Sequence, residues 1–284
     1  MIPTLNPVTT GQSVPVMDFL DAASTAGFPA IEYSITPFYQ FAQEKSIEYV
    51  KQLLLSKKLE IGSFQLPVEF RLDEETFTRD LAKLGAMAAF ARELGVTRCC
   101  TWLFPATDEP VAEYTCRFVR RLRECAKILG EYGIRFGIEW VGPKTLRATK
   151  KYEFIHTIPG ALDLIGAISE SNVGLLFDSF HWYTSGATTK DIEALTADQI
   201  VLVHINDAPD KPADEQIDNQ RLLPGEGIID LSGMLTSLRK IGYDSYLSIE
   251  TFSDELPLLG ADQAALKTKQ AVDHVLSGIF SKNG

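Results

Sequence analysis

Four residues in the second half of the chain have side chains that can bind a divalent metal ion. Glu139, Asp178, His204 and Glu250 each end a short apolar run, as in Val-Leu-Val-His and Leu-Ser-Ile-Glu. A single carboxylate at such a position commonly caps a helix or pairs with a cation. Three carboxylates packed together at the same depth would repel one another and raise one another's pKa values, and a divalent cation relieves that repulsion. Three carboxylates and an imidazole suit Mn²⁺, Zn²⁺, Co²⁺, Fe²⁺ or Mg²⁺, so we predict one divalent metal ion whose identity the residue types leave open.

These four residues can meet only if the strands before them end side by side. Short apolar runs, which are typical of strands, alternate along the chain with longer amphipathic stretches, and such βα alternation predicts a parallel sheet. The runs are nearly continuously apolar, as expected for parallel strands buried on both faces. The eight expected strands are Ile2–Asn6, Ala30–Ile35, Glu60–Leu66, Arg98–Phe104, Arg135–Val141, Gly174–Phe180, Ile200–Asn206 and Tyr246–Thr251.

The amphipathic stretches predict helices, and glycine follows several of them, as at Gly95 and Gly133, which is typical of a helix end. The expected helices are Val16–Ala26, Ser46–Lys57, Glu74–Leu94, Val111–Tyr132, Ile158–Ser169, Lys190–Leu195, Leu231–Ile241 and Asp262–Leu276. Eight βα units without a glycine-rich nucleotide turn after the first strand favour a closed barrel over an open sheet. We therefore expect residues 1–284 to form a single-domain (β/α)8 TIM barrel, a fold of about 250 residues with its active site at the C-terminal ends of the strands.

Composition restricts the partners. The formal net charge of −11 and the sequence pI of about 4.9 disfavour nucleic acid and anionic membranes. No apolar stretch approaches the roughly 20 residues that span a bilayer, and no charged leader precedes an apolar run. The four cysteines form no Cys-x-x-Cys pair, which favours reduced thiols. We expect a cytoplasmic protein that acts on a small molecule. The sequence leaves the oligomeric state open, a homo-oligomer included.

Five segments give the sequence a more specific resemblance. They are Gly-Ile-Glu139-Trp-Val-Gly-Pro, Phe-Asp178-Ser-Phe-His181, Val-His204-Ile-Asn-Asp, Arg221-Leu-Leu-Pro-Gly-Glu-Gly-Ile-Ile-Asp and Ser-Ile-Glu250-Thr-Phe. In this order they resemble the xylose isomerase-like superfamily of TIM barrels, the sugar phosphate isomerases and epimerases, and within it most of all the inosose (2-keto-myo-inositol) isomerases. The resemblance is strongest from Ile138 to Phe252, and the first quarter of the chain shares only the βα rhythm.

The resemblance implies that Glu139, Asp178, His204 and Glu250 ligate the metal and that His181 and Arg221 face the substrate. As ordinary loop residues, His181 would be packed and Arg221 solvated. Two further residues are candidates by position alone. Trp102 ends the fourth strand and could form an apolar wall against a ring, and Lys144 follows the fifth strand. For Trp102, packing against neighbouring side chains is at least as good an explanation of its position, and the same holds for Glu32 and Gln65 at the ends of strands two and three. Lys144 is equally well explained as an ordinary loop lysine in contact with solvent.

The implied substrate is a keto-sugar or keto-cyclitol. The metal would chelate the carbonyl oxygen and a neighbouring hydroxyl and act as a Lewis acid on the enediolate. Glu139 and Glu250 would be the catalytic residues: one removes the α-proton, and the same or the other returns a proton to the adjacent carbon. A hydride shift would need a second metal, and no second cluster is evident in the sequence.

Three other functions remain open. A cyclitol dehydratase or a lyase acting on 3-keto-glycosides would keep the metal and the enediolate but eliminate a group. A nuclease of the endonuclease IV type needs further metals and ligands, whereas the loop after strand seven offers Asn219, Gln220 and Arg221 and no histidine. A non-catalytic sugar-binding protein would not need the complete four-ligand set.

Overall fold

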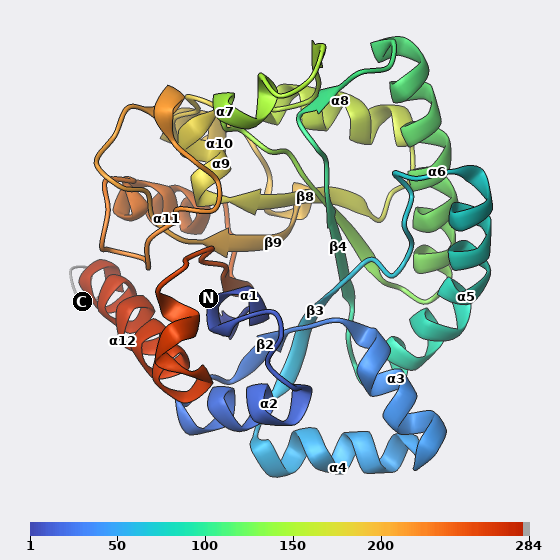
Figure 1. Ribbon diagram of the computed structural model, residues 1–284, viewed down its shortest axis with the longest axis vertical. Coiled ribbons are helices and arrows are strands. Elements are labelled where there is room, and N and C mark those ends of the chain that lie inside the picture. The colour runs from blue at the N-terminus through green and yellow to red at the C-terminus, as the bar shows by residue number, and fades with distance from the viewer. Residues whose placement is uncertain (281–284) are drawn as a thin grey trace.

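The computed structural model describes residues 1–280 as eight parallel strands closed into a barrel and surrounded by helices (Figure 1). The last strand pairs with the first, which closes the ring. The predicted (β/α)8 TIM barrel is therefore confirmed. The barrel strands are β1 (Ile2–Leu5), β2 (Ala30–Glu32), β3 (Glu60–Gln65), β4 (Arg98–Trp102), β6 (Arg135–Glu139), β8 (Val173–Asp178), β9 (Ile200–Ile205) and β10 (Tyr246–Ile249).

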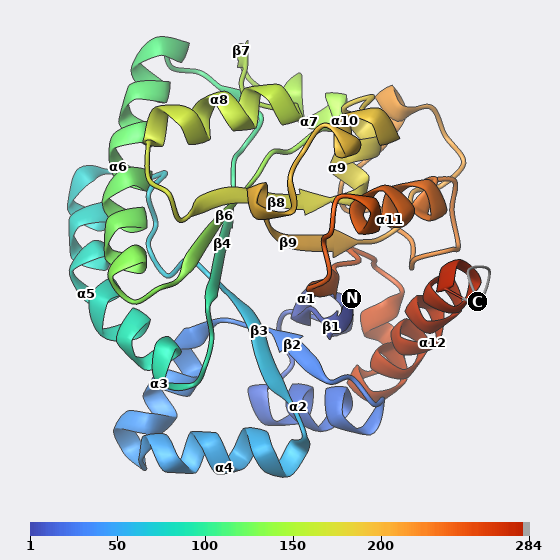
Figure 2. The same ribbon diagram turned by 180° about the vertical axis from the view of Figure 1, so that it is seen from behind.

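Helices cover the outside of the barrel, and each predicted helix is present with its ends shifted by a few residues at most (Figures 1 and 2). Gly95 and Gly133 have φ angles of 80° and 67°, a left-handed conformation that favours glycine after a helix. The predicted helices correspond to α2 (Val16–Thr25), α4 (Ile47–Lys57), α5 (Glu74–Glu93), α6 (Val111–Glu131), α8 (Ile158–Ile168), α10 (Thr189–Glu193), α11 (Leu231–Lys240) and α12 (Ala261–Phe280).

Several elements between the predicted strands and helices were not predicted, and all of them except the ten-residue helix α3 are short. A two-stranded antiparallel sheet joins the loops after β4 and β6. The unpredicted elements are α1 (Pro7–Thr10), α3 (Ile35–Glu44), α7 (Lys144–Arg147), α9 (Ser179–Thr184), β5 (Ala106–Thr107), β7 (Tyr152–Glu153) and the 3₁₀ turns η1 (Ala197–Gln199), η2 (Ala213–Glu215) and η3 (Leu256–Leu259).

All eight predicted strands run one to three residues past the observed strand ends, and in two of them a side chain caps a helix where the apolar run continues. The strand predicted to reach Ile35 ends at Glu32, and the Ser34 hydroxyl accepts a hydrogen bond from the Thr36 amide to begin α3. The strand predicted to reach Phe180 ends at Asp178, whose carboxylate caps α9. Capping satisfies the free amides of the first helical turn and so sets where each helix starts.

The register of the barrel brings the ends of its last strands to one level. Every residue of β9 is buried, as expected of a strand covered on both faces. Asp178 is the Cα partner of His204 across β8 and β9, and Ser248 is the Cα partner of His204 across β10 and β9. Figures 1 and 2 both show β8 and β9 side by side. Side chains at these positions therefore meet at the mouth of the barrel.

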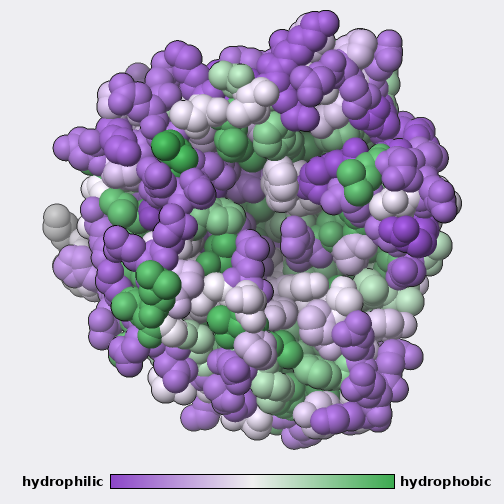
Figure 3. All heavy atoms as spheres, in the orientation of Figure 1, coloured by the Kyte–Doolittle hydropathy of each residue, from purple (hydrophilic) through white to green (hydrophobic). Residues whose placement is uncertain are grey.

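The surface seen in Figure 3 is mainly hydrophilic, with smaller hydrophobic patches, and it is hollowed near its centre. Across residues 1–280, we find no helix with the length and apolar character needed to cross a bilayer.

Candidate active site

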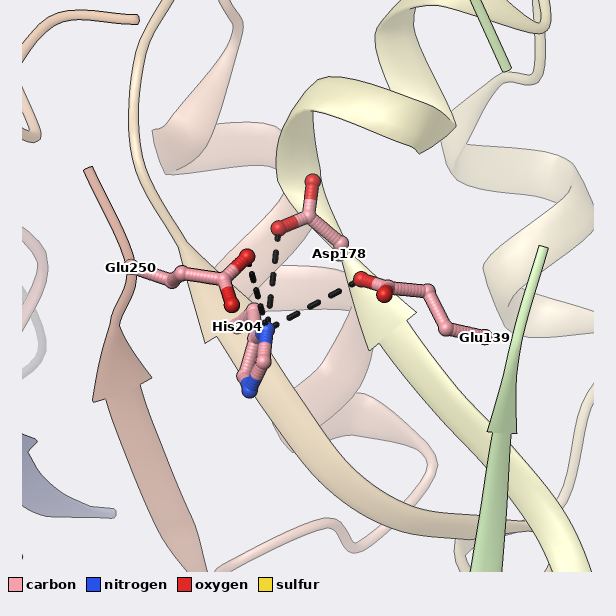
Figure 4. A group of neighbouring side chains, drawn as sticks. All are labelled: Glu139, Asp178, His204 and Glu250. Carbon is pink, nitrogen blue, oxygen red and sulfur yellow. Dashed lines mark ion pairs between the residues drawn. The ribbon is translucent and has the colours of Figure 1, made fainter. Parts of the chain in front are cut away.

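The structure brings the four predicted metal-binding side chains together at the mouth of the barrel (Figure 4). Glu139 and Asp178 end β6 and β8, His204 lies near the end of β9, and Glu250 follows β10. One potential ligand atom from each residue lies within 4.8 Å of the others. Glu250 and Glu139 approach His204 from opposite sides (Figure 4).

The spacing of these atoms is close to that of a metal-binding site. His204 Nδ1 lies 3.3 Å from Glu250 Oε2, 3.8 Å from Glu139 Oε1 and 4.0 Å from Asp178 Oδ2. Bonds of about 2.1 Å from an ion to nitrogen and oxygen ligands place neighbouring ligand atoms roughly 3.0–3.4 Å apart. A movement of less than about 1 Å would therefore bring the atoms into coordination.

Two of the inward-facing atoms lack a hydrogen-bond partner although they are buried. They are Glu139 Oε1 and His204 Nδ1, and they face each other at 3.8 Å. Burying a polar atom without a partner costs free energy. A cation between them would satisfy both atoms, so the residues fit a metal ion.

The four side chains influence one another's protonation. Burial, then repulsion from Glu250, raises the pKa of Glu139 well above its usual range. Burial also acts to raise the pKa of Glu250, but attraction to His204 and Arg221 outweighs it, so that pKa is lowered. Burial opposes protonation of His204, yet attraction to Glu32 and Glu250 raises its pKa well above the usual value. In the cluster, the Glu139 carboxyl group therefore favours its neutral, protonated form, and the Glu250 carboxyl group favours its negatively charged form.

Asp178 combines two structural tasks because its two oxygens point in different directions. Oδ1 accepts hydrogen bonds from the amides of Phe180 and His181, at 2.7 and 3.0 Å, and so caps α9. Oδ2 faces the cluster and accepts a hydrogen bond from Asn206 Nδ2 at 2.9 Å. The cap fixes the carboxylate plane and leaves Oδ2 available as a ligand.

Arg221 is buried beside the cluster and pairs with its carboxylates. Nη1 lies 3.1 Å from both Asp178 Oδ2 and Glu250 Oε2, and Nη2 lies 2.8 Å from Asp218 Oδ1 and 3.3 Å from His181 Nε2. Nε donates to the Asp218 carbonyl at 3.1 Å. Four of the five N–H groups of the guanidinium thus have acceptors within the protein, and the fifth faces the His181 ring. In this arrangement Arg221 balances the negative charge, and because it also lines the cavity at the barrel mouth, the substrate contact that the resemblance implies stays a prediction.

The loop that carries Arg221 is held by a buried carboxylate that the sequence interpretation missed. Asp207 accepts hydrogen bonds from the amides of Gly225, Gly227 and Ile229 at 2.9–3.0 Å. A side chain at position 227 would place its Cβ 2.2 Å from the Ala208 carbonyl oxygen, so this close approach requires glycine. The Pro-Gly-Glu-Gly segment is therefore a turn wrapped around Asp207.

His181 is buried beside the cluster and lines the cavity at the barrel mouth, and the substrate contact that the resemblance implies for it stays a prediction. Its Nδ1 accepts a hydrogen bond of 3.4 Å from the Gly142 amide, and its Nε2 lies 3.8 Å from Glu139 Oε1. Burial lowers its pKa, which favours the neutral imidazole. Because Nδ1 is an acceptor, the ring proton belongs on Nε2, which faces the cavity.

A cavity of about 720 Å³ opens above the cluster, and its lining includes His181, His204, Arg221 and the three glutamates Glu32, Glu139 and Glu250. Trp102 also lines it and is 37% exposed, with the Arg71 guanidinium 4.3 Å from its ring centroid. Such a ring can face a bound sugar or cyclitol.

Lys144 is placed elsewhere. It begins α7, its side chain is 54% exposed, and Nζ pairs with Asp214 Oδ2 at 2.7 Å. Lys144 is not among the described residues that line the cavity, so its position does not support the predicted substrate contact.

Two buried polar residues at the site were given no role from the sequence. Glu32 Oε2 lies 2.8 Å from His204 Nε2. Asn206 donates from Nδ2 to Asp178 Oδ2 at 2.9 Å and to the Glu250 carbonyl at 3.0 Å. The sequence did contain a pattern that indicates Asn206. It follows His204 by two residues, and side chains two positions apart on a strand lie on the same face.

The position of Arg221 predicts a large effect on stability. Replacing it with alanine leaves buried carboxylates without their counter-charge, and breaking a buried ion pair in this way typically costs about 3–5 kcal/mol. We expect the free energy of unfolding of the metal-free protein to fall by about this amount, as measured by urea denaturation with a chelator present.

Lys144→Ala is the matched control. It breaks an ion pair whose two side chains are 54% and 62% exposed, and such pairs contribute about 0–1 kcal/mol. Equal stability losses in the two variants would contradict the charge-balancing role of Arg221. Added Mn²⁺ or Zn²⁺ should stabilise wild type and both variants, and Arg221→Ala most of all, because there the ion also replaces the missing positive charge.

Comparison with known proteins finds inosose isomerases and a dehydratase with similar sequences. Inosose isomerase of Halalkalibacterium halodurans is 24% identical over 280 residues, which cover 97% of this chain and 96% of that protein. Inosose isomerase of Bacillus velezensis is 32% identical over 161 residues, 57% of this chain, so the match spans only about half (55%) of that relative. A 3-dehydroshikimate dehydratase of Pseudomonas aeruginosa is 28% identical over 267 residues, 92% of this chain and 39% of that protein.

Solved structures extend the similarity over the whole fold. A xylose isomerase domain protein from Alicyclobacillus acidocaldarius superposes with a TM-score of 0.90 at 28% identity over 98% of both chains. The IolI protein, solved with a zinc atom bound, superposes with a TM-score of 0.83 at 24% identity over 99% of this chain and 100% of that one. The family described as xylose isomerase-like TIM barrel matches residues 20–276, and the chain belongs to that family.

Proposed function

We propose that this protein is a metal-dependent isomerase or epimerase that acts on a keto-cyclitol or a ketose, as an inosose isomerase does. The observation that carries the proposal is the cluster of Glu139, Asp178, His204 and Glu250 at a cavity, with two of its atoms buried and unpartnered. The similarity to inosose isomerases along nearly the whole chain supports the substrate class.

The four cluster residues would hold one divalent ion. When bound, that ion supplies Lewis-acid stabilisation of the negative charge that develops on the substrate oxygens when an α-proton leaves. The zinc atom in the related IolI protein supports a metal of this kind.

The protein's own residues would move the protons. Glu139 and Glu250 present carboxylates from opposite sides of the cluster (Figure 4), so one can remove a proton from the substrate carbon and the same or the other can return it. His181, with its ring proton on Nε2, would donate a hydrogen bond to a substrate oxygen. Arg221 would keep the carboxylates in place by charge, and Trp102 would face the ring.

Proton exchange with solvent tests this reaction class. The protein, loaded in turn with Mn²⁺, Zn²⁺, Co²⁺, Fe²⁺ or Mg²⁺, is incubated in D₂O with keto-inositols and ketohexoses, and NMR follows deuterium at the carbon beside the carbonyl. We expect incorporation together with an isomeric product for at least one substrate. Absence of exchange with every pair of metal and substrate would contradict the proposal.

A second candidate is a dehydratase, favoured by the similarity to 3-dehydroshikimate dehydratase over 92% of this chain. It would use the same proton abstraction but expel a hydroxyl group from the neighbouring carbon. Mass spectrometry separates the two reactions, because an isomer keeps the substrate mass and a dehydration product is lighter by one water.

The charge of the cavity predicts a preference for substrates without phosphate. Its lining includes the carboxylates of Glu32, Glu139, Asp218 and Glu250, and no lysine among the described residues. Arg221 is the lining arginine, and four of its five N–H groups already have acceptors within the protein. Juxtaposed like charges cost several kcal/mol, so we expect kcat/KM for a phosphorylated ketose to be at least about tenfold below that of its free form. A phosphorylated sugar that is the better substrate would overturn this prediction.

A further inference from the structure

Glu32 is a buried carboxylate that the proposed reaction does not use. It ends β2, whereas the four cluster residues come from β6, β8 and β9 and from the loop after β10. Its Oε2 reaches across the barrel mouth to His204 Nε2 at 2.8 Å. The Ser248 hydroxyl donates to the same oxygen at 2.7 Å. Three strands, β2, β9 and β10, thus fix one oxygen atom against one ring nitrogen.

The two ring nitrogens of His204 have different surroundings. Nε2 faces a carboxylate oxygen, which in its ionised form is only an acceptor, so this nitrogen carries a proton. Nδ1 faces Glu139, Asp178 and Glu250 and has no hydrogen-bond partner. A proton on Nε2 leaves the lone pair of a neutral ring on Nδ1, directed at the point where the cluster atoms meet.

We infer that Glu32 is a positioning residue that holds His204 in the tautomer offering Nδ1 to the metal ion. This inference rests on the metal site of the proposed function. The hydrogen bond sets the ring orientation, and the carboxylate charge makes the coordinating nitrogen more basic. Partners of this kind behind a metal-bound histidine typically change metal affinity by about 10–100-fold. Glu32 would act through His204 and would not be a base for the substrate.

Zinc affinity, measured without any substrate, tests the inference. Wild type, Glu32→Gln and Glu32→Ala are titrated with Zn²⁺ in competition with a chromogenic chelator. Alanine removes both the hydrogen bond and the charge, so we expect a loss of about 100-fold; glutamine keeps an acceptor, so we expect about tenfold. Glu60→Gln, which changes an exposed carboxylate at the other end of a barrel strand, should leave the affinity unchanged. Wild-type affinity in both Glu32 variants would overturn the inference.

A second measurement needs no substitution at Glu32. The chain has four histidines, so NMR of ¹⁵N-histidine-labelled protein resolves few rings, and His204→Ala assigns one of them. With Zn²⁺ bound, we expect the His204 ring to keep its proton on Nε2 and to show the metal-induced ¹⁵N shift at Nδ1. Metal coordination through Nε2 would overturn the inference even if the Glu32 variants failed to fold.

The outcomes separate this inference from the proposed function. If wild type binds no zinc and no other divalent ion, the metal site itself is wrong and the inference falls with it. If wild type binds zinc and catalyses proton exchange while the Glu32 variants keep full zinc affinity, only the role of Glu32 is wrong.

Discussion

Replacing Glu139 or Glu250 with glutamine is expected to lower turnover by at least about 10²–10⁴-fold in one of the two variants, even with metal in excess. Glutamine has the shape of glutamate and keeps one oxygen for the metal, but it cannot accept a proton at that oxygen. This size of loss is typical when a general base is removed. The measurement pairs steady-state turnover with solvent deuterium exchange on the same samples.

Two controls make this prediction specific to catalysis. Metal content is determined for each variant, so that loss of the ion is not mistaken for loss of the base. Glu255→Gln changes an exposed carboxylate in the loop after β10 and should leave turnover near the wild-type value. If both Glu139→Gln and Glu250→Gln bound metal and kept near-normal exchange and turnover, glutamate bases would be excluded.

Metal binding itself should depend strongly on His204. Elemental analysis of protein purified without chelator should find about one divalent ion per chain, as a single four-residue cluster implies. His204→Ala removes the one nitrogen ligand. The three carboxylates then remain without the imidazole that reduced their mutual repulsion. We expect this variant to lose most of the ion, and its activity with it.

His156→Ala is the matched control for that experiment. His156 is a partly buried histidine whose ring contacts the Phe154 carbonyl and Glu153. The His156→Ala variant should retain the full metal content. Retention of the ion in His204→Ala would show that the ligand set has been assigned to the wrong residues.

The fold and the cluster were predictable because both depend on local patterns. A buried parallel strand is a short apolar run, and the polar residue that ends it lies at the barrel mouth. Glu139, Asp178, His204 and Glu250 each follow this rule, so four local observations placed four side chains at one level. The parallel pairing of neighbouring strands then brought them together, as the register between Asp178 and His204 shows.

The features that the sequence did not predict depend on contacts between segments far apart in the chain, or on places where a strand pattern and a helix-capping residue overlap. Glu32 and His204 are 172 residues apart, and only the closed barrel makes them partners. The apolar residues up to Ile35 continue the strand pattern, but the Ser34 cap starts a helix there. Lys144 follows the fifth strand as expected, yet the turn at Pro143 begins a helix and directs the lysine toward Asp214.

The pairing of β10 with β1 has a consequence for how the protein keeps its fold. Glu250 follows β10, and the strand that closes the ring against β10 is the first in the chain, Ile2–Leu5. The four ligands lie on or directly after neighbouring strands of the second half of the chain, but Glu32 at the end of β2 reaches His204 only in the closed ring, when the two ends of the chain have met. An ion that binds the closed ring and not the open chain adds about 2.7 kcal/mol to the folding free energy at a free concentration 100 times its Kd. The supply of metal would then govern how large a fraction of the molecules is folded as well as how many are active.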